Sequence, residues 1–296
     1  MADGEIFRTD DARFAGLPDY PFEPHYATLR SGLRLHYVDE GPRDAPPVLM
    51  LHGEPSWSYL YRHMIGPVAA TGRRVLAPDL IGFGKSDKLL DPAAYSYAAH
   101  VAWIREWLET LDLTGVTLVC QDWGSLVGLR LVAELPDRFA AVVLSNGGLP
   151  DGTRFSRAFQ LWRTFALWSP VFPIGRIIQT GTKRRLSDDE RRAYDAPFPT
   201  AASKAAARIF PALVPIDADD PAVPDQRRAW AVFERWHKPF LCCFSDGDPI
   251  TRGGASAFLD RVPGTAGQPH RTLTGGHFVQ EDDPQGFCQA VASLSA

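Results

Sequence analysis

Residues 119–126, "VCQDWGSL", contain the turn on which the predicted fold depends. An apolar segment ends at Cys120, a polar pair follows, and small residues open the next segment. This outline is typical of a nucleophile elbow, a tight strand-to-helix turn that exposes one reactive side chain. Such a turn needs small residues two positions before and after its centre, and Cys120 and Gly124 occupy those positions. The centre is Asp122, where serine is usual. An aspartate that caps a surface helix would suit the same residues, so the surrounding sequence must distinguish the two.

The segments around the elbow alternate between strand and helix patterns. A β-hairpin is predicted over 25–29 and 33–41, because both stretches alternate and end in turn residues. Short apolar runs predict further strands at 46–53, 73–80, 115–120, 140–145, 239–245 and 270–275. Helices are predicted from Tyr97 to Leu111, over 125–135 and over 284–294. This order implies an α/β fold with a parallel sheet and helices on both faces.

The alternation is interrupted between residues 149 and 235. This stretch is rich in Arg, Pro, Phe and Trp and lacks runs typical of strands, so we predict helices split by prolines, at 152–168, 186–195, 200–210 and 224–236. We therefore expect two units: a core of residues 1–148 and 236–296, and a helical lid of residues 149–235.

Composition excludes several classes of protein. The 296 residues are 45% hydrophobic and 22% charged, and 31 basic and 35 acidic side chains give a net charge of −4. Because no long charged run occurs, we expect neither nucleic acid nor a membrane surface as a partner. The first residues lack the basic start and apolar run of a signal peptide, and no stretch approaches the ~18 apolar residues of a membrane span.

The cysteines indicate a reducing compartment. Cys120, Cys242, Cys243 and Cys288 mostly lie in apolar runs and are expected to be reduced thiols of a cytoplasmic protein. No C-x-x-C or H-x-x-x-H spacing occurs, so no metal site is predicted.

An elbow nucleophile requires a base and an acid that orients it. His277 in "TGGHFVQED" follows the last predicted strand, where this type of fold places its base. Asp248 in "CCFSDGDPI" follows the preceding strand, and Asp246 is the second choice. The chain order Asp122, Asp248, His277 is nucleophile, acid, base, as in the α/β-hydrolases.

The segment "LHGEPSW" adds an oxyanion hole. A turn after the third strand supplies one backbone N–H and the residue after the nucleophile supplies the other, which would be the amides of Glu54 and Trp123. His52 is expected to be structural, since His277 already has the position of the base.

Four segments together resemble the haloalkane dehalogenases: "HGEPSWSYLYR", "DLIGFGKSDK", "QDWGSLVGLRL" and "GGHFVQED", with "FQLWRTF" and "YDAPFP" in the lid. The resemblance spans nearly the whole chain. It implies an α/β-hydrolase fold with a mostly parallel eight-stranded sheet. It also places the chain in the branch with the acid after the seventh strand, at Asp248. In the other branch the acid follows the sixth strand, which here ends in "VVLSNGG", and Asn146 cannot be an anion.

The resemblance explains an aspartate at the elbow. A carboxylate can attack an sp³ carbon that carries a halogen, and the resulting ester on Asp122 is hydrolysed with His277 as base, giving a primary alcohol, a halide and a proton. A departing halide needs N–H donors, which the indoles of Trp123 and Trp162 would supply, Trp162 being the residue that matches the family's lid tryptophan. Glu54 would order the catalytic water. The expected partners are a halogenated small molecule, water and halide, with no cofactor and no metal, and the chain is expected to be a monomer.

Several side-chain positions in the lid stay open. Trp168 is the second choice as halide donor, but it is expected to pack in the core, as are Trp230 and Trp236. Phe165, Phe172 and Leu213 are candidate walls of the substrate pocket.

Three other functions remain as alternatives. An epoxide hydrolase uses the same ester but needs two lid tyrosines, and Tyr194 is the only tyrosine between Leu149 and His237. A fluoroacetate-type dehalogenase would need an arginine pair beside the nucleophile, where "QDWGSLVG" has none. A non-catalytic binding protein often loses a member of the triad, and here all three positions are filled.

Overall fold

An eight-stranded sheet forms the centre of the structure, a computed structural model that describes residues 5–153 and 156–294. The strand order is β10-β9-β8-β7-β4-β5-β3-β2, and a separate short sheet pairs β1 with β6. The strands are β1 Ile6–Phe7, β2 His25–Thr28, β3 Arg34–Glu40, β4 Pro47–Leu51, β5 Arg74–Pro78, β6 Lys88–Leu89, β7 Val116–Asp122, β8 Phe139–Gly147, β9 Phe240–Ser245 and β10 Arg271–Leu273.

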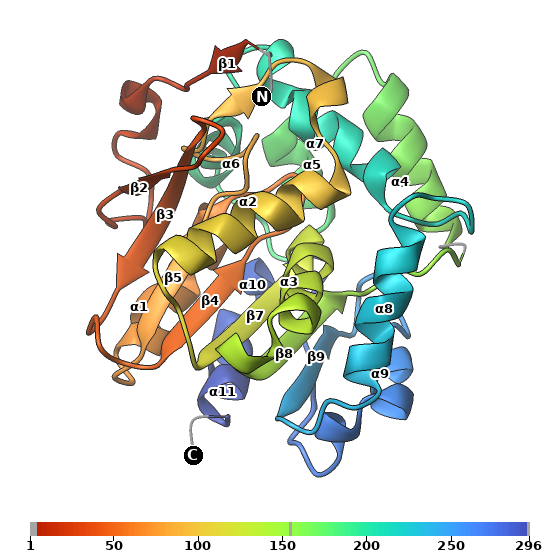
Figure 1. The fold of residues 1–296 in the computed structure, drawn as a ribbon. Helices are drawn as coiled ribbons and strands as arrows, with labels where there is room; N and C mark the ends of the chain where they lie inside the picture. Colours follow the sequence, from red (N-terminus) through yellow and green to blue (C-terminus); the bar gives the residue numbers. More distant parts are fainter. Residues whose placement is uncertain (1–4, 154–155, 295–296) are drawn as a thin grey trace.

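Helices cover both faces of this sheet (Figure 1). The α-helices are α1 Arg62–Ala69, α2 Tyr97–Thr110, α3 Trp123–Glu134, α4 Arg157–Trp168, α5 Ile174–Thr180, α6 Asp188–Asp195, α7 Ala205–Ile209, α8 Val223–Phe233, α9 Ala255–Arg261, α10 Val279–Asp282 and α11 Pro284–Ala292. In the view of Figure 1, α2, α3 and α8 lie in front of the sheet, and α1 packs against α11 behind it. The predicted α/β architecture, with a mostly parallel eight-stranded sheet and helices on both faces, is confirmed.

The parallel part of the sheet is buried on both sides. β5, β4, β7, β8, β9 and β10 run parallel, whereas β2 and β3 form the predicted antiparallel hairpin at one edge. Strands covered on both faces need continuous apolar sequence rather than alternation. The run "PVLML" of β4 is buried throughout for this reason. The first ten residues of α3 are buried as well, since this helix packs between the sheet, α2 and α8.

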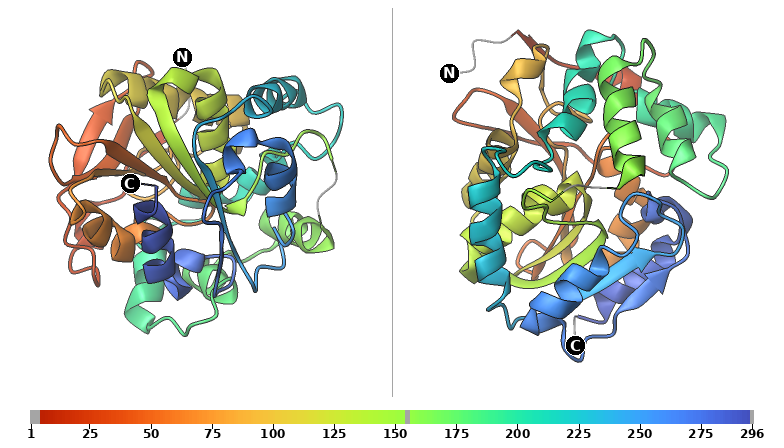
Figure 2. Two further views of the ribbon diagram at one scale, coloured as in Figure 1. Left: turned by 90° about the horizontal axis from the view of Figure 1, so that it is seen from below. Right: turned by 90° about the vertical axis from the view of Figure 1, so that its right-hand side faces the viewer.

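A run of helices is inserted between β8 and β9. The right-hand view of Figure 2 shows α4–α7 gathered beyond one end of the sheet, whereas α8 returns along its face. We call residues 149–235 the helical insertion. The division of the chain into a core and a lid at these residues is a proposal. The sequence predicted helices at α4, α6, α7 and α8 but not at α5, which has only about two turns and follows Pro170 and Pro173 closely. Arg154 and Phe155, within the first predicted helix, lie outside the described residues, and α4 begins at Arg157.

Ion pairs and caps connect the insertion to the core. Ser187 and Glu190 form a capping box at the start of α6. Glu190 and Glu281 both accept hydrogen bonds from Arg62 of α1, at 2.9 Å and 2.5 Å. Arg184 of the insertion pairs with the same two carboxylates. These largely buried pairs join the insertion to α1 and to α10, the helix that begins two residues after His277.

None of the helices in the described ranges is long and apolar enough to cross a membrane.

Candidate active site

The turn at Asp122 has the strained geometry of an elbow. Asp122 ends β7 with φ 50° and ψ −127°, in a region that only glycine adopts easily, and α3 starts at the next residue. The strand and helix approach so closely that a Cβ on Gly124 would lie 1.9 Å from the carbonyl oxygen of Leu51. A Cβ on Gly53 would lie 2.4 Å from that of Asp122. Glycine at both positions therefore allows Asp122, at the end of β7, to lie close to the loop that follows β4.

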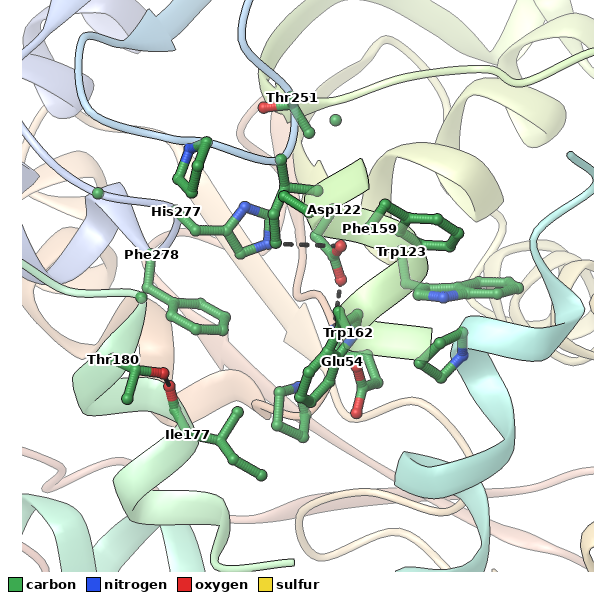
Figure 3. A pocket seen from close by; sticks show the side chains of 18 of the residues that line it. Glu54, Asp122, Trp123, Phe159, Trp162, Ile177, Thr180, Thr251, His277 and Phe278 are labelled. Carbon is green, nitrogen blue, oxygen red and sulfur yellow. Dashed lines mark hydrogen bonds and ion pairs between the residues drawn. The ribbon is translucent and has the colours of Figure 1, made fainter. Parts of the chain in front are cut away.

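His277 lies between two carboxylates that are far apart in the sequence. Its Nε2 is 3.4 Å from Oδ2 of Asp122 (Figure 3). On the other side of the ring, its Nδ1 is 3.0 Å from Oδ2 of Asp248. Asp248 is buried and also accepts hydrogen bonds from the Ile250 amide, at 2.8 Å, and from the Thr251 hydroxyl. The structure thus brings together the three residues predicted as nucleophile, acid and base.

The charges of this group shift the pKa values in opposite directions. Burial acts against the charge of Asp248, but His277, Thr251 and the Ile250 amide outweigh it and lower the pKa of Asp248 to about 2. Burial likewise acts against the imidazolium, but Asp248 and Asp122 outweigh it and raise the pKa of His277 to about 10. Asp248 is therefore an anion at neutral pH, and its carboxylate fixes the proton on Nδ1.

Glu54 contacts the nucleophile through its main chain. Its amide N–H donates to Oδ1 of Asp122 at 2.7 Å, which is where one donor of an oxyanion hole was predicted. The Glu54 side chain is buried, and its Oε1 has no partner within the described part of the chain. Burial and the charge of Asp122 raise the pKa of Glu54 well above its usual value, although His277 and a hydrogen bond with Trp162 oppose this shift. The buried position beside Asp122 therefore disfavours the charged form of Glu54 relative to an exposed glutamate.

An apolar cavity of about 330 Å³ opens above the nucleophile. Asp122, Glu54 and His277 line its floor, and α4 and α5 contribute Phe159, Trp162 and Ile177 (Figure 3). Other apolar walls come from Leu126, Pro211, Val214 and Phe278. A cavity of this size and lining suits a small apolar molecule. The predicted walls Phe165, Phe172 and Leu213 are wrong, because none of the three lines the cavity.

Two indoles lie beside the carboxylate, as the sequence predicted. Trp123 follows Asp122 directly and is held edge-on against Phe210 and Tyr97, with ring centroids 4.4 Å and 5.3 Å away. Trp162 of α4 also lines the cavity, and its ring contacts those of Phe165 and Phe172.

The remaining tryptophans divide between core and surface. Trp230 and Trp236 are buried, as predicted, but Trp168 is 80% exposed at the end of α4. The prediction that Trp168 packs in the core is therefore wrong. Since it does not line the cavity, it is not the second halide donor either.

Two amide side chains next to His277 were not singled out as site residues by the sequence. Gln121 Nε2 lies 3.1 Å from the main-chain oxygen of His277 and 3.1 Å from its Nε2. Asn146 Nδ2 donates to the same main-chain oxygen at 3.0 Å. Gln121 directly precedes the nucleophile and Asn146 occupies the alternative acid position, so their place in the chain is the only signal that could have drawn attention to them.

Two further candidates have structural roles. His52 accepts the Leu80 amide at Nε2, 2.9 Å away, so its Nδ1 carries the proton and donates to the Gly53 carbonyl at 2.9 Å. Asp246, the second choice for the acid, pairs with Lys183 at 2.7 Å instead of with His277.

His63, Glu190 and Glu281 lie close enough to hold a metal ion. However, Arg62 and Arg184 already neutralise both carboxylates. The donors of this cluster therefore form an ion-pair network.

Comparisons with known proteins agree with this geometry. The family model described as alpha/beta hydrolase fold matches residues 46–284. A protein of Mycolicibacterium paratuberculosis named haloalkane dehalogenase is 52% identical over 97% of each chain. One of the same name from Psychrobacter cryohalolentis is 52% identical over 94% of each chain.

Solved structures give the same result. The haloalkane dehalogenase DpaA from Paraglaciecola agarilytica NO2, described as a tetramer, superposes with a TM-score of 0.91 at 34% identity, covering 98% of both chains. Sequence and structure therefore agree over nearly the full length, and the chain belongs to the haloalkane dehalogenases of the α/β-hydrolase fold.

Proposed function

We propose that this protein hydrolyses the carbon–halogen bond of small haloalkanes through a covalent ester on Asp122. The observation that carries the proposal is the carboxylate itself, held on a strained elbow below an apolar cavity, with His277 on one side and two indoles beside it. A serine at this position would attack carbonyl carbon, whereas a carboxylate can displace a halide from an sp³ carbon.

In the first step an oxygen of Asp122 attacks the carbon that carries the halogen. The C–O bond forms as the carbon–halogen bond breaks, and the electron pair of the carbon–halogen bond leaves with the halide. The indole N–H groups of Trp123 and Trp162 bind this anion, because indole donates and presents no lone pair to repel it. The raised pKa of Glu54 supports this assignment, since burial disfavours a second carboxylate that would repel the leaving halide.

In the second step water attacks the carbonyl carbon of the ester. His277 takes one proton from the water at Nε2, and Asp248 stabilises the imidazolium through Nδ1. The amides of Glu54 and Trp123 bind the oxyanion. When the ester C–O bond breaks, the imidazolium returns the proton to the alcohol oxygen. The carboxyl group ionises, so each turnover yields an alcohol, a halide and a proton.

An epoxide hydrolase is disfavoured by the same cavity. That reaction needs O–H donors for the epoxide oxygen, and Tyr194 does not line the cavity. Its hydroxyl donates to Glu281 instead.

A single turnover in water labelled with ¹⁸O tests the ester directly. With enzyme in excess over 1-bromobutane, the label should appear in the Asp122 carboxylate and not in the alcohol, because water attacks the carbonyl carbon. Peptide mass spectrometry measures the label in the carboxylate, and gas chromatography coupled to mass spectrometry measures it in the alcohol. Label in the alcohol alone would mean that water displaces the halide directly.

The assembly and location of the protein complete the proposal. We retain a monomer as the prediction, although α4 exposes an apolar stripe of Leu161, Phe165 and Trp168, and the similar DpaA is described as a tetramer. A solution mass of 32.7 kDa would support the monomer, and a multiple of it would contradict it. Four free cysteines support a cytoplasmic location. The helical insertion, residues 149–235, is proposed to act as the lid.

A further inference from the structure

Gln121 contacts His277, the proposed base, at Nε2, the ring nitrogen that takes the proton from water. The residue is buried on β7, directly before Asp122, and its Nε2 lies 3.1 Å from the main-chain oxygen of His277. The same Nε2 lies 3.1 Å from the ring Nε2 of His277. Gln121 Oε1 has no partner in the described ranges.

The contact with the main chain determines which way this amide faces. A carbonyl oxygen only accepts hydrogen bonds, so the nitrogen of the Gln121 amide, not its oxygen, must face His277 O. The amide nitrogen carries two hydrogens, and the second is available to His277 Nε2. Because Asp248 fixes a proton on Nδ1, the Nε2 of a neutral ring presents a lone pair to this hydrogen.

If the ring of His277 were protonated at Nε2, the Gln121 amide would repel it. Its Nε2–H would face the Gln121 N–H, and two donors 3.1 Å apart repel. The positive end of the amide dipole thus opposes protonation at Nε2.

Other charged groups face the ring of His277 or the cavity beside it. They come from the elbow, from the loops after β9 and β4, and from the insertion: Asp122, Asp248, Glu54 and Lys183. Lys183 is paired with Asp246, and burial favours the uncharged form of Glu54. The two carboxylates Asp122 and Asp248 therefore determine how strongly the free protein holds a proton on His277.

This balance changes during the reaction. When Asp122 becomes an ester it loses its charge, and the attraction at Nε2 that favoured the imidazolium disappears. Asp248 still favours the cation from the Nδ1 side, so the Gln121 amide is the opposing group that remains at Nε2.

We propose that Gln121 is a positioning residue of ester hydrolysis, whose amide keeps Nε2 of His277 as a proton acceptor once Asp122 is alkylated and so sets the pH above which the ester is hydrolysed. This inference rests on the proposed function. It adds to it a residue that acts through the base and does not touch the substrate.

The test measures hydrolysis of the alkyl-enzyme as a function of pH. The protein reacts with 1-bromobutane at pH values between 5 and 10 and is quenched at successive times. Intact-protein mass spectrometry then measures the fraction of alkyl-enzyme. Gln121→Met keeps the length of the side chain and removes both N–H groups. We expect the acid limb of the hydrolysis rate to move up by about one pH unit, the usual value of one hydrogen bond to the neutral form. Hydrolysis below the limb then falls about tenfold, while bromide release in the first turnover stays within about twofold.

Asn146→Ser is the matched control. It removes donors to the same His277 carbonyl but does not face the ring nitrogen, so its acid limb should stay in place even if hydrolysis becomes slower. A Gln121→Met limb that coincides with the wild-type limb would overturn the inference and leave Gln121 a purely structural residue. Failure of the wild type to form any alkyl-enzyme would instead refute the proposed function, and this inference with it.

A second measurement needs no change at Gln121. In ¹⁵N-labelled protein with Asp122→Asn, which imitates the uncharged ester, the amide nitrogen of Gln121 should couple to a deprotonated Nε2 of His277 across the hydrogen bond at pH 7.5. A protonated Nε2 without this coupling would overturn the inference even if Gln121→Met does not fold.

Discussion

Replacing Trp162 by phenylalanine separates a halide donor from a packing residue. The change keeps a ring that can contact Phe165 and Phe172, whose centroids lie 5.8 Å and 5.7 Å from that of Trp162. It removes the indole N–H that the proposal directs at the halide. Because the packing is largely kept, we expect the free energy of unfolding to change by less than about 1 kcal/mol.

The size of the functional effect follows from the chemistry of the donor. A hydrogen bond to a charged group contributes about 1.5–3 kcal/mol, and 1.4 kcal/mol corresponds to a tenfold change. The bromide dissociation constant of Trp162→Phe should therefore rise roughly 10- to 150-fold. Cleavage of the carbon–bromine bond should slow by about 10- to 1000-fold, in line with the loss of one preorganised donor in a dry site.

Quenching of tryptophan fluorescence by bromide measures the dissociation constant. Rapid-quench bromide release measures the rate of carbon–bromine cleavage. Trp168→Phe is the matched control, because Trp168 is on the same helix but 80% exposed and outside the cavity. It should leave both quantities unchanged. If Trp162→Phe keeps bromide affinity and the cleavage rate within twofold of the wild type, Trp162 only packs.

Three other changes test the remaining roles. His277→Phe should release about one bromide per chain and stop as a stable ester on Asp122, visible as a mass increase; continued turnover would exclude His277 as the base. Asp248→Asn should slow ester hydrolysis by roughly 10²- to 10⁴-fold, because it removes the carboxylate that holds the proton on Nδ1 of His277 and stabilises the imidazolium. The pKa of this carboxyl is lowered from 3.8 to about 2, so it stabilises the fold above pH 3.8 and the stabilisation is lost as the pH falls toward 2; acid titration of the wild type should show a loss of stability in this window that the variant lacks. Glu54→Gln should keep bromide release within about fivefold, since the raised pKa of Glu54 already disfavours its charged form, and a larger loss would show that an ionised Glu54 is required.

The sheet could be predicted because its signals are local. Each parallel strand is a short apolar run bounded by glycine, proline or a polar turn, and β4, β7, β8 and β9 all appear at the expected places. The pairing of β1 with β6 could not be predicted, since two residues have no period. The apolar spacing of Leu161, Phe165 and Trp168 predicts a helix face but not whether that face meets the core or solvent.

Chain order was enough to predict the three proposed catalytic residues, but not the residues that contact them. Asp122, Asp248 and His277 each stand at or after the end of a recognisable strand, so their order predicted the roles that we propose for them. The contacts of Gln121 and Asn146 with His277 depend on how β7 and β8 approach the loop after β10, and no local pattern contains that information. The favoured charge state of Glu54 likewise depends on burial next to Asp122, which only the folded chain provides.

Bromide release from 1-bromobutane by the wild type and by Asp122→Ala tests the central claim most directly. The account predicts repeated turnover by the wild type and no release by the variant, because the carboxylate is the group that displaces the halide. Release by Asp122→Ala at the wild-type rate, or no release by a folded wild-type protein, would contradict it.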